Sequence, residues 1–125
     1  MILIDSFGWI EYFTDGPLTD KYATYVETAS PTYTLTPTIV IYEVYKVIKR
    51  EVGEDKALEA YAQLKNTKIV PLDENLSLSA ADISLEFGMP MADSVIYATA
   101  KRFGANIVTS DSHFEGKNGV TFITM

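Results

Sequence analysis

Four acidic residues hold positions from which their side chains could act together: Asp5, Glu43, Asp93 and Asp111. Asp5 ends an unbroken apolar run that starts at the first residue, which is typical of a short strand buried on both faces of a parallel sheet. Asp111 follows a second such run, Asp93 lies in the first turn of an expected helix, and Glu43 lies about two turns into another. In a parallel sheet, the carboxyl ends of strands and the starts of the following helices share one edge. We therefore expect the four carboxylates to converge.

A cluster of four carboxylates calls for a cation. Such a cluster persists only if a cation binds it, if some members stay protonated, or if other contacts offset the repulsion. Oxygen ligands without cysteine or paired histidine favour Mg²⁺ or Mn²⁺ over zinc or copper. A site with one or two such cations suits phosphodiester hydrolysis, since the metal activates a water and stabilises charge on the leaving oxygen. Hydroxyl groups beside the acids could hold metal waters or phosphate oxygens: Ser6, Ser94, Thr109 and Ser110.

Each acid could also have a purely structural role. An aspartate after a strand is often a turn or cap residue, which fits Asp5 and Asp111 taken singly. Asp93 would be favoured by the helix dipole alone. Glu43 could be a surface partner of Lys46, three residues later. The prediction of a site therefore depends on the joint placement of the four acids.

The chain offers no competing nucleophilic arrangement. It has no cysteine, which excludes a thiolate nucleophile, a disulfide and a structural zinc site. Its only histidine, His113, lies in an expected loop. We expect it to be an ordinary loop residue, and contact with metal or phosphate is the less favoured alternative. There is no glycine-rich phosphate loop and no GxSxG turn. Metal-assisted hydrolysis is the reaction that these residue types favour.

Length and composition set further bounds. A chain of 125 residues that is 47% hydrophobic can fill one core but not two, so we expect a single domain over residues 1–125. No apolar run approaches the roughly 18 residues of a membrane span, and no signal peptide is recognisable, which predicts a soluble, cytoplasmic protein. The net charge of −7 argues against nucleic acid as a partner. Cations held by clustered carboxylates would, however, reverse the sign that a phosphate meets.

Apolar periodicity predicts an α/β protein. Short β-prone runs predict five strands, within residues 1–5, 33–35, 68–72, 105–109 and 120–123. Helical spacing predicts six helices, at about residues 6–13, 18–29, 37–52, 54–65, 76–87 and 91–103. Their alternation predicts a three-layer α/β/α sandwich with a mostly parallel five-stranded sheet.

Three local expectations are specific enough to check. Thr36 is expected to cap the helix that follows, with Pro37 at its first position. Pro71 places the third strand near an edge of the sheet. The first helix presents an apolar stripe that contains Trp9, while Glu11 points elsewhere.

Several segments, taken in order, form a recognisable pattern. They are Ile4-Asp5-Ser6 followed by Trp9-Ile10-Glu11-Tyr12-Phe13, Ile41-Tyr42-Glu43-Val44, the run Ala92 to Ala100 that contains Asp93, and Val108-Thr109-Ser110-Asp111 with Phe114 three residues on. This set resembles the PIN-domain family and, within it, the VapC-type toxins of prokaryotic toxin–antitoxin pairs. The resemblance covers nearly the whole chain. Any one segment is unspecific, whereas the ordered set at this length is specific.

The resemblance implies a metal-dependent endoribonuclease in which Asp5, Glu43, Asp93 and Asp111 surround Mg²⁺ or Mn²⁺. It also implies a homodimer, and a small antitoxin protein that blocks the cleft and helps to bind operator DNA, which is reached only through the antitoxin. Many members carry another acidic residue at the position of His113, so a fifth carboxylate is lacking here and the number of metals stays open. The RNA substrate would be structured or single-stranded.

Other classes of protein are alternatives to a PIN-type nuclease. A catalytically idle PIN-like module would act through partner contacts, and the presence of all four acids counts against it. A phospho-switch receiver domain has similar length and topology and would use Asp73 after the third strand, but no lysine follows Phe122 and Ile123 as that class requires. A haloacid-dehalogenase-type phosphatase expects a second aspartate two residues after Asp5, where Phe7 stands.

Overall fold

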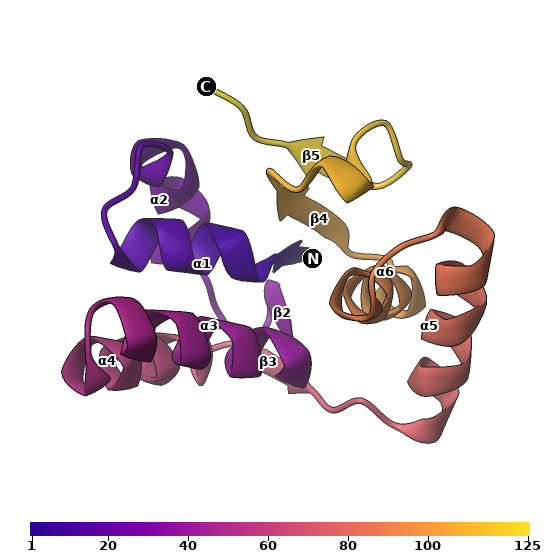
Figure 1. Cartoon of the computed structure of the whole chain (residues 1–125), viewed down its shortest axis with the longest axis horizontal. Coiled ribbons are helices and arrows are strands. Elements are labelled where there is room, and N and C mark those ends of the chain that lie inside the picture. The colour runs from indigo at the N-terminus through magenta and orange to yellow at the C-terminus, as the bar shows by residue number, and fades with distance from the viewer.

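The computed structural model describes residues 1–125 and contains a five-stranded sheet in which all neighbouring strands are parallel (Figure 1). The strands are β1 (Ile2–Ile4), β2 (Thr34–Pro37), β3 (Lys68–Val70), β4 (Asn106–Thr109) and β5 (Val120–Phe122). Their spatial order is β3-β2-β1-β4-β5, so β1 is the central strand. A central strand is covered on both faces, and Leu3 and Ile4 are accordingly completely buried. The apolar start of the chain is therefore the middle of the sheet.

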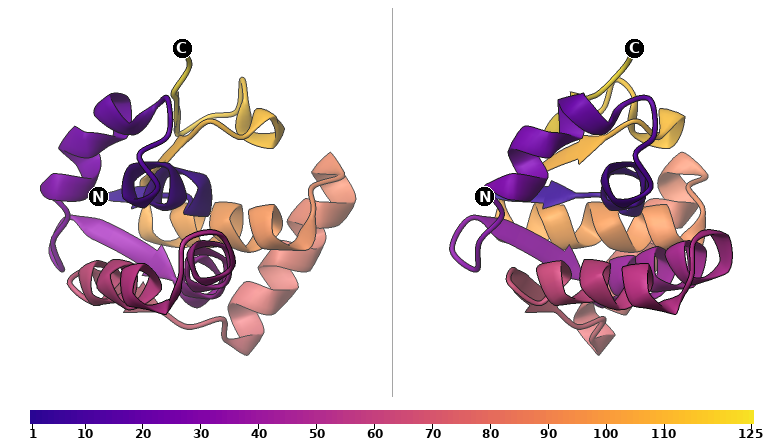
Figure 2. Two further views of the ribbon diagram at one scale, coloured as in Figure 1. Left: turned by 60° about the vertical axis from the view of Figure 1, so that its left-hand side comes forward. Right: turned by 90° about the vertical axis from the view of Figure 1, so that its left-hand side faces the viewer.

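Six α-helices and one short 3-10 helix connect the strands. They are α1 (Ser6–Phe13), α2 (Thr19–Glu27), α3 (Thr38–Glu51), α4 (Glu54–Leu64), α5 (Glu74–Phe87), α6 (Met91–Phe103) and the 3-10 helix η1 (Ser112–Phe114). Figure 1 shows α1 to α4 on one side of the sheet and α5 with α6 on the other. Helix α6 packs on β1, β2 and β4, and α5 packs on α6, outermost in the left view of Figure 2. The predicted three-layer α/β/α class is confirmed.

A hydrophobic core of 28 buried residues fills the space between the sheet and its helices. Its largest fully buried side chains include Trp9 from α1, Tyr22 from α2 and Ile96 from α6. The core thus draws on both helical layers, which is what holds the strand ends in a defined place. No helix is both long enough and apolar enough to cross a membrane.

The start of α3 differs from the expectation. Strand β2 continues through Pro37, which is the N-cap of α3, so the helix begins at Thr38. The prediction that Thr36 caps this helix is wrong, because its buried hydroxyl bonds to the hydroxyl of Thr67 at 2.6 Å instead. Thr67 in turn donates to the carbonyl of Leu64. This chain of polar contacts ties β2 to the turn before β3.

The remaining elements lie where the sequence predicts them, with ends that shift by no more than two residues. Strand β3 is an edge strand, as Pro71 predicts, and it stops one residue before that proline. One element was not predicted: the polar loop before β5 contains η1, whose N-cap is Asp111. A three-residue 3-10 helix carries no periodic pattern, so only the cap could have indicated it.

Glu11 is buried beneath the loop between α1 and α2. Only 8% of the residue is exposed, and its Oε2 accepts a hydrogen bond from the backbone N–H of Leu18 at 2.9 Å. A Cβ on Gly16 would lie 1.9 Å from Glu11 Oε1, so the loop can close over the carboxylate only because residue 16 is glycine. Helical spacing separates Glu11 from the apolar stripe but does not reveal this burial, which arises because the loop between α1 and α2 folds back over the side chain.

This contact gives a first prediction. Replacing Glu11 with alanine leaves the buried N–H of Leu18 without its acceptor, so the free energy of unfolding should fall by about 1–3 kcal/mol. Urea denaturation followed by circular dichroism measures the loss. The matched control is Glu86→Ala, which removes an exposed glutamate from α5 and should change stability by less than about 0.5 kcal/mol. Equal losses in the two variants would contradict the structural role.

Candidate functional site

Asp5 lies at the carboxyl end of the central strand. It follows β1 directly, and its backbone N–H donates to the carbonyl of Val108 in β4. The side chain is the N-cap of α1, where Oδ1 accepts a hydrogen bond from the N–H of Gly8 at 3.0 Å. Only 3% of the residue is exposed. Asp5 is therefore a cap residue, as its purely structural interpretation predicts. The capping hydrogen bond also holds the carboxylate at the edge of the sheet, so a role in a site is compatible with it.

Thr109 connects the two acids that end the strands. Strands β1 and β4 pair with Ile4 opposite Val108, which brings Thr109 beside Asp5. The Thr109 hydroxyl donates to Asp5 Oδ2 and accepts from the backbone N–H of Asp111 at 2.9 Å. One buried hydroxyl thus holds one acid through its side chain and the other through its backbone.

Asp93, Asp111 and His113 form a compact group. Asp93 lies in the first turn of α6, and His113 lies in η1, two residues after Asp111. The Nδ1 atom of His113 lies 2.9 Å from Asp93 Oδ2 and 2.8 Å from Asp111 Oδ1. One potential ligand atom from each residue lies within 4.8 Å of the other two. His113, expected mainly as a loop residue, is therefore part of the cluster; its position two residues after a strand-end aspartate was the available signal.

Glu43 is placed differently from the three aspartates. It lies on α3, which packs against α6, and it is partly exposed. It does not belong to the group whose ligand atoms lie within 4.8 Å. Its negative charge nevertheless raises the pKa of Asp5, as does that of Asp111. The structure thus brings Asp5, Asp93 and Asp111 into mutual electrostatic contact and leaves Glu43 farther from the centre.

The surroundings of the cluster favour the protonated form of two of its carboxyls, Asp5 and Asp93. Burial is the main cause that raises the pKa of Asp5 to about 6, and the hydrogen bonds from Thr109 and Gly8 counteract it. Burial, followed by the charge of Asp111, raises the pKa of Asp93 to about 7, while His113 acts in the opposite direction. Both carboxyls hold a proton more tightly than ordinary aspartates, and a cation could take the place of those protons.

The predicted supporting hydroxyls have partners of their own. Ser94 donates to the carbonyl of Pro90 at 2.9 Å, and Ser110 shares a hydrogen bond with the phenol of Tyr22 at 2.5 Å. Thr109 is engaged with the two acids described above. Ser6, at the start of α1, is partly exposed and makes no side-chain hydrogen bond. Their roles toward metal waters or phosphate remain predictions.

The donor atoms of the cluster fit a divalent cation. They are carboxylate oxygens with a single ring nitrogen, a set that suits Mg²⁺ or Mn²⁺ and lacks the thiolates of a structural zinc site. Burial is the main cause of both raised pKa values, and neighbouring carboxylates raise them further, so the ionised acids lack a balancing positive charge. Chemically, the cluster can hold a hard cation against a phosphate group at an edge of the sheet.

Thr109 supplies a second prediction. Thr109→Val keeps the shape but removes the hydroxyl that orients Asp5 and Asp111, so affinity for Mn²⁺ should fall about 10- to 100-fold. Calorimetric titration with Mn²⁺ measures it. Thr109→Ser restores the hydroxyl and should recover most of the affinity. If serine performs no better than valine, the hydrogen bonds are not what matters at this position.

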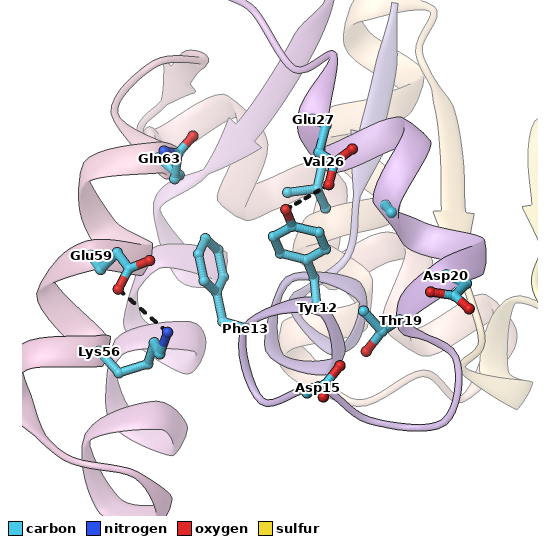
Figure 3. Close-up of a pocket in the computed structure, with 11 residues that line it drawn as sticks. Tyr12, Phe13, Asp15, Thr19, Asp20, Val26, Glu27, Lys56, Glu59 and Gln63 are labelled. Carbon is cyan, nitrogen blue, oxygen red and sulfur yellow. Dashed lines mark hydrogen bonds and ion pairs between the residues drawn. The ribbon is translucent and has the colours of Figure 1, made fainter.

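A cavity of about 650 Å³ lies away from these acids, between α1, α2 and α4 (Figure 3). Figure 3 shows Tyr12 bonded to Glu27 on one wall and Lys56 paired with Glu59 on the other. None of the candidate site residues lines it. The cavity is therefore separate from the acidic cluster.

Comparisons with known proteins agree with this architecture. The family model described as the PIN domain matches residues 2–119. A toxin–antitoxin complex from Klebsiella pneumoniae is similar in structure, with a TM-score of 0.79, 21% identity, and 97% of this chain and 96% of that chain covered. A VapC toxin from Mycobacterium tuberculosis that cleaves the sarcin–ricin loop gives a TM-score of 0.80 at 16% identity, covering 96% and 97%.

A third similar structure is DNA-bound VapBC from Salmonella typhimurium, with a TM-score of 0.73, 14% identity and 98% of both chains covered. No curated protein sequence matches the chain significantly. At these identities the structural matches demonstrate a shared fold, and the family model supplies the family.

Proposed function

Because the chain belongs to the PIN-domain family, we propose that it is an endoribonuclease that hydrolyses RNA phosphodiester bonds with Mg²⁺ or Mn²⁺. The observation that carries this proposal is the meeting of buried and half-buried acids from β1, β4 and α6 at one edge of the sheet. The fold itself is used for many purposes, so the activity is argued from these side chains.

The proposed metal ligands are Asp5, Glu43, Asp93 and Asp111. Asp5 is immobilised by Gly8 and Thr109, so it would present a fixed carboxylate to the ion. When bound, the cation supplies an activated water and positive charge for the phosphodiester. The carboxylates orient the ion, and the core beneath them keeps their geometry preorganised.

The direct test uses purified full-length protein and RNA stem-loops with single-stranded loops, the parts of RNA where sequence-specific recognition usually occurs. Cleavage is expected with Mn²⁺ or Mg²⁺, should stop when EDTA is added, and should return with excess metal. Cleavage that continues in EDTA would contradict the metal-dependent mechanism. The absence of cleavage in every loop sequence and with either metal would contradict the nuclease assignment.

We further propose that the protein is the toxin of a toxin–antitoxin pair and acts in the cytoplasm. The similar structures from Klebsiella pneumoniae and Salmonella typhimurium are a toxin–antitoxin complex and DNA-bound VapBC, respectively. A net charge of −7 makes direct binding of operator DNA unfavourable, so contact with DNA would be made by the antitoxin. Expression of the chain alone should arrest growth, and co-expression of a short neighbouring gene product should relieve the arrest.

A homodimer is the proposed assembly. Two leucines on the outer face of α5 are largely exposed, Leu78 at 67% and Leu85 at 86%, and Met91 at the start of α6 is 70% exposed. Leu78 and Leu85 are seven residues apart, so they lie on the same face of the helix. We propose that the two exposed leucines on this face form the centre of the dimer interface, since clustered exposed apolar side chains often do so.

The dimer yields a third prediction. The double variant Leu78→Lys with Leu85→Lys places charge on this face and should convert a dimer into a monomer, with the stability of the fold changed by less than about 1 kcal/mol. Light scattering after size-exclusion chromatography gives the mass. A variant that keeps the dimeric mass would exclude this face as the interface.

A further inference from the structure

His113 is the one member of the group of potential ligands that is not a carboxylate. It is the only histidine of the chain, and it supplies the only nitrogen in the group of three that could hold an ion. Its Nδ1 atom lies within 3 Å of one oxygen of Asp93 and one of Asp111. A nitrogen in direct contact with two carboxylates stands beside the place that a shared cation would occupy.

The two separations match those of neighbouring ligands on one ion. Ligands at right angles around an octahedral ion, with bonds of about 2.1 Å, lie about 3.0 Å apart. The observed separations from Nδ1 are 2.9 Å and 2.8 Å. These are also hydrogen-bond lengths, so the ring and the carboxylates share a proton in the metal-free protein, and an ion would replace that proton.

The backbone of η1 keeps the ring in this place. The N–H of His113 donates to Asp111 Oδ1 at 2.9 Å, so the residue that carries the imidazole is tied to the neighbouring carboxylate. Asp111 is in turn held through its own N–H by Thr109. The imidazole is thus positioned by the same hydrogen bonds that position the acids.

We propose that His113 binds the divalent cation directly through Nδ1 and shifts the preference of the site toward Mn²⁺ relative to Mg²⁺. This inference rests on the proposed function, because the same carboxylates hold the ion. Mg²⁺ and Mn²⁺ both prefer oxygen ligands, but Mn²⁺ is a transition-metal ion and accepts an imidazole nitrogen more readily than Mg²⁺ does. The bound ring is the neutral tautomer, with its proton on Nε2 and the Nδ1 lone pair directed at the ion.

Electron paramagnetic resonance provides the first test. Because His113 is the only histidine, untagged protein labelled with ¹⁵N-histidine carries the label at this residue alone. Mn²⁺-loaded protein should show a ¹⁵N hyperfine coupling of the size expected for a directly bound imidazole. The coupling should be absent from His113→Asp and retained in Ser112→Ala, a control that changes an exposed side chain in the same short helix.

Calorimetry provides the second test. His113→Asp exchanges the nitrogen for a carboxylate oxygen, so the Mg²⁺ dissociation constant divided by that for Mn²⁺ should fall about tenfold. His113→Ala should weaken Mn²⁺ binding more than Mg²⁺ binding. Neither readout depends on RNA cleavage.

The outcomes separate the two proposals. If the protein binds Mn²⁺, and Asp93→Asn abolishes that binding, but no ¹⁵N coupling is found, His113 is not a ligand and the proposed nuclease stands. An unchanged ratio of dissociation constants in His113→Asp overturns the tuning of metal preference. If the wild-type protein binds no divalent ion at millimolar concentration, both this inference and the metal dependence fail.

Discussion

Replacing Asp93 with asparagine should lower the rate of RNA cleavage at least about hundredfold, equivalent to about 2.7 kcal/mol of lost transition-state stabilisation. The amide keeps the size of the side chain but loses the negative charge. Asp93 belongs to the group of three potential ligands, and its Oδ2 contacts His113, so the substitution removes an anionic ligand from the proposed metal site. The measurement is the initial rate of cleavage of a fluorescent stem-loop in saturating Mn²⁺.

A matched control separates local chemistry from general damage. Asp82→Asn makes the same exchange at an exposed position on α5 and should leave the rate within about twofold. Circular dichroism should show that both variants are folded. If Asp93→Asn retains more than about a tenth of the wild-type rate, the carboxylate of Asp93 is not required and the arrangement proposed for the metal site is wrong.

Asp5 combines the second large effect on activity with a gain in stability. Asp5→Asn should abolish cleavage while raising the free energy of unfolding of the metal-free protein at pH 8. The reason is that burial raises the pKa of Asp5 from 3.8 to about 6, so the folded protein binds the proton more tightly than the unfolded chain does. Asparagine removes the charge that the fold has to bury. The gain should stay below about 3 kcal/mol, because the amide nitrogen cannot accept one of the two hydrogen bonds that Gly8 and Thr109 donate to Asp5.

The pH dependence follows from the direction of this shift. The contribution of Asp5 to stability is fully present below about pH 4, and it is lost as the pH rises through the folded-state value of about 6. Asp93, with a pKa raised to about 7, adds a loss of the same sign. Metal-free wild-type protein should therefore become less stable between pH 4 and pH 8, and Asp5→Asn should show a smaller decline.

Urea unfolding in EDTA across this pH range measures both curves. Saturating Mn²⁺ should reverse the order at pH 8, because it stabilises the wild-type protein by binding the folded state and has a weaker site in the variant. If the free energy of unfolding in EDTA falls equally with pH in wild-type protein and in Asp5→Asn, the raised pKa of Asp5 is contradicted. Residues that destabilise the metal-free protein in this way are typical of functional sites, where function is retained at a cost in stability.

Local patterns in the chain were enough to predict the framework. The apolar run through Ile4 predicted a buried strand because a central parallel strand is apolar on both faces. Met91 to Phe103 was predicted without error, because a proline before the helix and a glycine after it mark its two ends. The rule that parallel strand ends share an edge then predicted that Asp5, Glu43, Asp93 and Asp111 converge. The structure brings the three aspartates together and leaves Glu43 farther out.

What the sequence determined by itself was therefore the class of fold and the edge of the sheet where acids gather, since both follow from periodicity and connectivity. Only the tertiary structure decided the partners of individual polar groups. Thr36 bonds across to Thr67, Glu11 is enclosed by a returning loop, and His113 reaches the carboxylate of Asp93 from a different element. These contacts join residues that are distant in the chain, or depend on how a turn closes, and their energies are set by burial, which no local spacing encodes.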